Sequence, residues 1–161
     1  MSAEDKLAGL GLALPEPPRP LGSYRAVSEA GDLLFISGQV PFADGKMAYT
    51  GRIGEQLTVE DGRRAAQLTA LNVLAQIKQH LGGFDRLGHI VRVDGHVSSA
   101  DGFHGQPAVL DGASDLFAAV LGEKAGHARS AFSHWQLPAD AAVVLVVIAL
   151  VLPARRCQPH L

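Results

Sequence analysis

Apolar residues recur every three or four positions between Thr58 and Gly82, which predicts one long amphipathic helix. Thr58 is followed three residues later by Asp61, the spacing of a capping box, and Gly82-Gly83 is expected to end the helix. The apolar stripe consists of Ala65, Leu68, Leu71, Val73, Leu74, Ile77 and Leu81. A helix of this length can cover one face of a sheet.

The most apolar stretch of the chain runs from Ala141 to Leu152 and contains no charged residue. It is rich in valine, which favours a strand, and it is too short to cross a bilayer as a helix. Because its apolar residues do not alternate with polar ones, both of its faces are expected to be buried.

Two strands, Tyr24–Val27 and Asp32–Ser37, are predicted near the start of the core, joined at the turn Glu29-Ala30-Gly31. The sequence Ser37-Gly38-Gln39-Val40-Pro41 then interrupts the second strand. A glycine and a proline here are typical of an ordinary bulge, and they would equally permit a ligand to approach the main chain. A short strand is expected at Met47–Thr50, after the Asp44-Gly45 turn.

A further strand is predicted at Ile90–Val97, reached by a crossover that would make it parallel to an earlier strand. Pro107 is expected in the first turn of a second helix that ends at Gly122. At the N-terminus, Ser2 and Asp5 have capping-box spacing, and the prolines of residues 15–20 predict an extended arm over the surface.

These elements follow the order β-β-(β)-α-β-α-β-β, which indicates an α+β fold with a mixed sheet and two helices packed on one face. The 161 residues are expected to form one domain, with an arm at 1–21, a core at 22–152 and a tail at 153–161. No predicted helix remains for the second face of the sheet. That face is therefore expected to meet other copies of the chain.

Charge and cysteine content exclude several classes of function. The net charge is −2 and the 14 Lys and Arg residues form no basic block, so nucleic acid is not the favoured partner. Cys157 is the only cysteine, which excludes an internal disulfide and is typical of a reducing compartment. Acidic residues in the first positions do not fit a secretory signal, and no membrane association is expected. A cytoplasmic location follows.

No cofactor motif is present. The chain lacks a Gly-x-Gly-x-x-Gly fingerprint, a P-loop and a Gly-x-Ser-x-Gly elbow. None of the seven histidines forms a His-x-His or His-x-x-x-His pair, so no metal site is expected.

Arg129 is the strongest candidate for a binding residue, because it lies close before the apolar final strand. Its guanidinium could hold a carboxylate or phosphate, or could simply pair with an Asp or Glu of a neighbouring loop or subunit. His127 shares strand parity with Arg129 and could contact the same ligand. His134 has the opposite parity, and with Trp135 it is expected to serve packing.

Three motifs, in order and at their spacing, resemble the RidA/YjgF family of enamine/imine deaminases, older members of which are called endoribonuclease L-PSP. They are Ser37-Gly38-Gln39-Val40-Pro41, the long capped helix, and Ala128-Arg129-Ser130 running to Leu137-Pro138 before the final strand. The likeness covers roughly residues 22–150 and is greatest with a longer branch that carries sequences similar to 111–116 and 122–131.

The resemblance implies a chorismate-mutase-like fold and a homotrimer with three clefts between subunits. It also implies that Arg129 grips a substrate carboxylate, that main-chain groups at Gly38 and Ala131 hold substrate or water, and that Tyr24 lines the cleft. A small carboxylate or imino acid would be the ligand.

Two positions depart from the family pattern. Val146 stands where the deaminases carry a glutamate that positions water, and valine cannot activate water. Asp111 stands near a frequent cleft asparagine, and its charge would repel a carboxylate unless it is protonated or paired. Three functions remain open: a hydrolytic deaminase of 2-imino acids, a binder of small carboxylates without that activity, and an endoribonuclease.

Overall fold

The structure is a computed structural model and describes residues 1–154. Cys157 and most of the expected tail at 153–161 lie outside the described residues. The buried hydrophobic side chains of the described part form one cluster between the helices and the sheet. None of the described helices is long and apolar enough to span a membrane.

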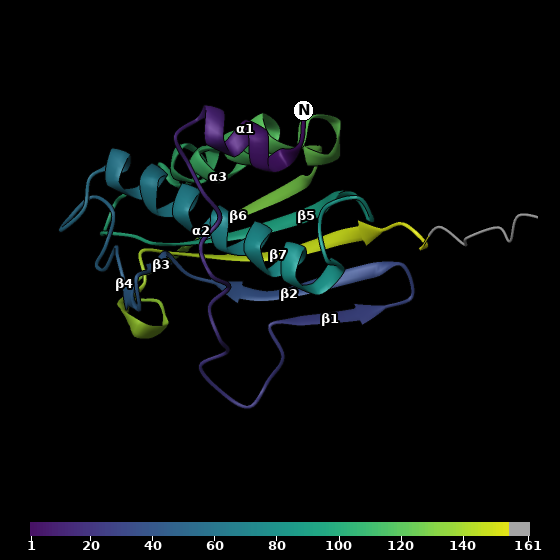
Figure 1. The fold of residues 1–161 in the computed structure, drawn as a ribbon. Coiled ribbons are helices and arrows are strands. Elements are labelled where there is room, and N and C mark those ends of the chain that lie inside the picture. Colours follow the sequence, from purple (N-terminus) through teal and green to yellow (C-terminus); the bar gives the residue numbers. More distant parts are fainter. Residues whose placement is uncertain (155–161) are drawn as a thin grey trace, which may run out of the picture.

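A five-stranded mixed sheet is the base of the fold, with the strand order β1-β2-β7-β5-β6 (Figure 1). All neighbouring strands are antiparallel except β5 and β6, which are parallel. The strands are β1 (Val27–Ala30), β2 (Leu33–Gln39), β5 (Leu87–Ser98), β6 (Ala128–His134) and β7 (Val143–Val151). The predicted element order and α+β class are confirmed.

The direction predicted for the strand after the long helix is confirmed. β5 runs in the same direction as β2, because both strands are antiparallel to β7. The final strand β7 inserts between them, however, so the parallel partner of β5 is the later strand β6. A local pattern cannot reveal such an insertion, since it depends on which strands pair across the sheet.

The first hairpin is shifted relative to its prediction. Ala30 pairs with Leu33, so the turn consists of Gly31 and Asp32, with Gly31 at a φ of 61°. Tyr24 therefore precedes the strand rather than starting it. The short strand expected at Met47–Thr50 is also misplaced: β3 (Phe42–Ala43) pairs with β4 (Lys46–Met47) around the Asp44-Gly45 turn.

Helices α2 (Val59–Leu81) and α3 (Gln106–Leu121) lie side by side on one face of the sheet (Figure 1). The capping box of α2 is formed by Thr58 and Asp61, and the helix ends at Gly82 with a φ of 72°. Leu110 of α3 packs directly over Gly95 of β5, where a Cβ atom would lie 2.3 Å from a leucine methyl group. This close approach sets α3 against the sheet.

Helix α1 (Ala3–Gly9) has the predicted capping box and packs on α3. Its Leu7 is 1% exposed and belongs to the core. The proline-rich arm has no helix or strand, as predicted, and the side-chain amide of Gln76 in α2 donates to the carbonyl of Pro18 over 2.8 Å. Short 3-10 turns, η1 (Gly122–Ala125) and η2 (Pro138–Asp140), precede β6 and β7.

Only one face of β7 is buried within the chain, so the burial expected for its second face depends on other copies of the chain. Residues 143, 145, 147, 149 and 151 point toward the helices and are buried. On the opposite face Val146 is 37% exposed, Phe35 is 41% exposed and Phe132 is 42% exposed. We refer to this side of the sheet, away from α2 and α3, as the open face.

Candidate functional site

Arg129 lies on the edge strand β6 and its side chain turns toward α3. It pairs in register with Val93 of β5, which is buried beneath the helices. Its Nη1 donates to Asp111 Oδ1 over 2.8 Å and to Ser114 Oγ over 3.1 Å, and its Nη2 reaches the carbonyl of Pro107 at 3.4 Å. The alternative in which Arg129 pairs with an acidic residue therefore holds within one chain.

Asp111 and Ser114 reach Arg129 together because they are three residues apart on α3, and residues at that spacing share a helix face. Asp111 was expected to require pairing or protonation, and its partner is Arg129 itself. Ser114 was not predicted as a site residue. Its spacing from Asp111 is the signal that could have identified it.

His127 joins the same group through Ser114. Its Nδ1 lies against the carbonyl of Ala125, which can only accept, so Nδ1 carries the proton. Nε2 is then free to accept from Ser114 Oγ, 2.9 Å away, and the ring edge packs on Phe117. The prediction that His127 and Arg129 lie on the same side is confirmed by their shared contact with Ser114.

The guanidinium of Arg129 is not fully used by these contacts. Its Nε makes no hydrogen bond to any residue within 1–154, and the contact of Nη2 with Pro107 is long for a hydrogen bond. The side chain keeps 23% of its surface exposed. One edge of the planar fork, Nε and Nη2, is therefore available to an incoming carboxylate.

Tyr24 and Gly38 lie at a second location, beside a cavity of about 330 Å³ under the proline-rich arm. The sheet register shifts between Ile36 and Gln39, which confirms the predicted bulge. A Cβ atom at Gly38 would lie 3.1 Å from Val144 and 3.9 Å from Val146, so a larger residue would crowd the valine side chains at this point. The cavity walls are mainly apolar and include Pro18, Leu21, Val40, Phe42, Ala139 and Val144.

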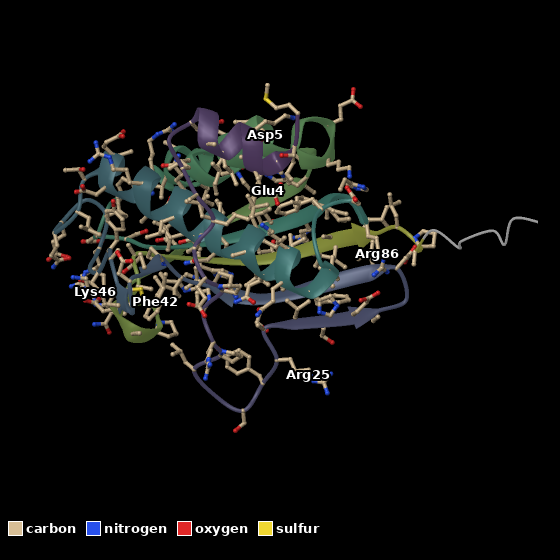
Figure 2. All side chains as sticks on the ribbon, in the orientation of Figure 1. Glu4, Asp5, Arg25, Phe42, Lys46 and Arg86 are labelled. Atoms are coloured by element: carbon tan, nitrogen blue, oxygen red, sulfur yellow. The ribbon has the colours of Figure 1, made fainter. Side chains whose placement is uncertain are left out.

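The cavity is framed by segments far apart in the sequence. Phe42, labelled in Figure 2, comes from β3, and Ala139 comes from the turn before β7 (Figure 2). Ala139 has a φ of 55°, a conformation that a residue with a Cβ atom rarely adopts. Such local strain is concentrated at binding and switch regions.

The six predicted site residues thus form two groups in one chain. Arg129 and His127 both contact Ser114, and Asp111 pairs with Arg129. Ala131 is two residues further along β6 with the parity of Arg129. Tyr24 and Gly38 border the cavity at β2. The strands β7 and β5 separate β2 from β6, so a single copy does not bring the two groups together.

His134 does more than pack. It points to the open face, as parity predicted, and its Nε2 lies 2.7 Å from Nδ1 of His96 on the neighbouring strand. Burial and the nearby His134 lower the pKa of His96, while Asp94 acts in the opposite direction. Within residues 1–154 no group of three or more His, Cys, Asp or Glu side chains is arranged to hold a metal ion.

Comparison with known proteins assigns the fold to a family. The family model described as "YjgF/chorismate mutase-like, putative endoribonuclease" matches residues 4–151. The chain belongs to the YjgF/chorismate mutase-like family. The resemblance inferred from the three motifs is confirmed.

Proteins with similar sequences and structures support the assignment. Protein TCP17 of Trypanosoma cruzi is 41% identical over 138 residues, which cover 85% of this chain and 86% of TCP17. The crystal structure of Atu1372 of Agrobacterium tumefaciens, a protein of unknown function, is 38% identical with a TM-score of 0.88 and covers 92% of each chain. A structure titled as a putative endoribonuclease from Shewanella oneidensis is 35% identical with a TM-score of 0.90, covering 93% of this chain and 99% of that one.

Proposed function

We propose that this YjgF-family chain is a hydrolytic deaminase of small 2-imino acids, the reaction implied by its resemblance to the enamine/imine deaminases. The observation that carries the proposal is the half-used guanidinium of Arg129. It is held by contacts with α3, yet Nε and Nη2 along its other edge can donate two hydrogen bonds to a carboxylate. An anchored carboxylate orients the adjacent imine carbon for attack by water.

The complete site requires a second copy of the chain. Arg129 and Gly38 are on opposite sides of β7 and β5, whereas the family resemblance implies that both contribute to one cleft. The open face exposes Phe35, Phe132 and Val146, large apolar groups that another copy would cover. A homotrimer in which β6 of one copy faces β2 of the next would unite the two groups.

The cavity beside Gly38 is suited to the side chain of the substrate. Its walls include apolar side chains such as Val40 and Phe42, so moving a methyl or larger aliphatic group from water into the cavity would be favourable. The bulge at Gly38 leaves main-chain groups near its rim, so the polar end of the ligand can remain hydrogen-bonded there.

The alternative is a protein that binds small carboxylates without turning them over. Val146 favours it, since valine at the position of the usual glutamate cannot orient water. The deaminase and the carboxylate binder both require Arg129 as the anchor, so binding experiments test this common claim. Only a measurement of turnover distinguishes the two functions.

RNA cleavage is the second candidate function, because the family model carries the description of an endoribonuclease. A chain with a net charge of −2 and no basic block can neutralise few phosphates, so its charge does not favour RNA binding. Incubation with RNA at low salt tests it directly. Cleavage that is lost in Arg129→Ala would favour it over the deaminase.

Titration calorimetry with a 2-oxo acid, the product of the proposed reaction, tests the anchor. Arg129→Ala should raise the Kd by roughly thirtyfold or more, because a charge-assisted bidentate contact contributes about 2–4 kcal/mol. Arg64→Ala, which removes a cation exposed on α2, is the matched control and should bind as the wild type does. If Arg129→Ala binds the 2-oxo acid with the affinity of the wild type, Arg129 is not the carboxylate anchor.

A further inference from the structure

The hydroxyl of Ser114 lies between a cation and a base. Its oxygen accepts from Arg129 Nη1 over 3.1 Å, and its proton can pass to His127 Nε2 over 2.9 Å. The carbonyl of Ala125 fixes the tautomer of the ring, because it can accept only from a protonated Nδ1. A hydroxyl, a base and a group that orients the base are the parts of an activated hydroxyl site.

We propose that Ser114 and His127 transfer the protons of the deamination, the role that the family resemblance assigns to a glutamate. Ser114 is then a catalytic residue, and His127 is a positioning residue that accepts its proton. The inference rests on the proposed function. In the proposed reaction Ser114 contacts the attacking water, and His127 acts through Ser114. Their position is suitable because the imine carbon is bonded directly to the carboxylate that Arg129 would hold, and Ser114 Oγ accepts from Nη1 of the same guanidinium.

The reaction balances with this pair alone. Water attacks the carbon of the iminium C=NH₂⁺ and forms a C–O bond, the π electrons move to nitrogen, and the proton released by water passes through Ser114 Oγ to His127 Nε2. His127 returns this proton to the amino group. The C–N bond then breaks and ammonia is released, and the remaining hydroxyl proton passes through Ser114 to His127 as the ketone forms. His127 gives this proton to the ammonia, which departs as ammonium and leaves His127 neutral again.

Within residues 1–154, the charged side chains hydrogen-bonded to this cluster are Asp111 on α3 and Arg129 on β6, and Phe117 packs at the edge of the His127 ring. Asp111 is the competing base. Its Oδ1 is already engaged by Arg129, whereas Nε2 of His127 has a hydroxyl proton donor directed at it.

Steady-state kinetics on an imino acid generated in situ tests the pair. Ser114→Ala should lower kcat on the order of a hundredfold while KM and 2-oxo acid affinity change little. Ser114→Thr keeps the hydroxyl and should restore most of the rate. His127→Gln keeps a hydrogen-bonding side chain but removes the base, and it should lower kcat to a similar extent while 2-oxo acid affinity changes little.

The remaining outcomes separate this inference from the proposed function. Full activity of Ser114→Ala, or its loss only in Asp111→Asn, would overturn the pair while leaving the deaminase in place. If the wild type shows no turnover, labelling by phenylmethylsulfonyl fluoride tests whether His127 activates the Ser114 hydroxyl. In that reaction an S–O bond forms, fluoride leaves, and the serine proton passes to His127. A mass increase at Ser114 that His127→Gln abolishes supports the pair without the deaminase, and no label in an inactive protein overturns both.

Discussion

The Asp111 carboxylate accepts a hydrogen bond from Arg129 Nη1 over 2.8 Å, and it therefore competes with any carboxylate ligand for the same cation. The pair joins α3 to β6 and is partly exposed, with Asp111 keeping 47% of its side-chain surface. Asp111 fixes the guanidinium and at the same time reduces its attraction for an anion.

Replacement of Asp111 by asparagine should strengthen carboxylate binding. The amide oxygen still accepts from Arg129, while the competing charge is gone, so the Kd of a 2-oxo acid should fall about two- to fivefold at low salt. The gain should shrink as salt is raised, since it is electrostatic in origin. Weaker binding in Asp111→Asn at every salt concentration would show that the carboxylate supports the ligand instead of opposing it.

Gly112 allows the closest contact between α2 and α3. A Cβ atom at this position would lie 2.1 Å from the carbonyl oxygen of Arg63, so Gly112→Ala must force the helices apart. We expect a loss of about 1–3 kcal/mol and a Tm lowered by roughly 3–10 °C. Gly126→Ala, where nothing lies within 4 Å, is the control. A Tm equal to that of the wild type in Gly112→Ala would contradict the packing described for these helices.

The His96–His134 contact predicts that stability falls in acid. The pKa of His96 is held below its ordinary value of 6.5, first by burial and then by His134. As the pH drops below about 6.5 the unfolded chain takes up a proton before the folded chain does, so the free energy of unfolding decreases. The Tm should therefore be lower at about pH 5 than at about pH 7.5. His96→Gln should flatten this dependence, whereas the same change at the exposed His104 should not.

Periodicity and capping predicted the fold well where the signal is local. The boxes at Thr58 and Ser2 start α2 and α1, and Pro107 lies in the first turn of α3. The insertion of β7 between β2 and β5 could not be predicted, because strand pairing is a property of the whole sheet. Alternation along β7 shows which residues face the helices, whereas the burial of its second face depends on contacts outside one chain.

The site was predicted in part. Strand parity placed His127 on the side of Arg129 and His134 on the other side, since alternation is dictated by the backbone. A serine within a helix carries no motif of its own, so the spacing of Ser114 from Asp111 is its signal in the sequence. The contact of His134 with His96 was also missed, because it joins two strands that are distant in sequence.

The open face predicts association into a trimer, whose mass light scattering can measure. Val146→Arg places a charge on this face and should yield a single chain, because a buried unpaired charge opposes assembly. Ala119→Arg adds the same charge to an exposed position of α3 and should leave the mass at three chains. Wild-type protein with the mass of one chain at micromolar concentration would contradict both the trimer and a cleft built from two copies.

Hydrolysis of an imino acid is the most direct test of the proposed deaminase. An amino-acid oxidase generates the 2-imino acid, semicarbazide traps what remains, and the trapped product is followed by its absorbance. The wild type should diminish the trapped product in proportion to its concentration, and Arg129→Ala should lose this effect because the carboxylate is no longer held. An unchanged yield of trapped product at every concentration of the wild type would contradict the account.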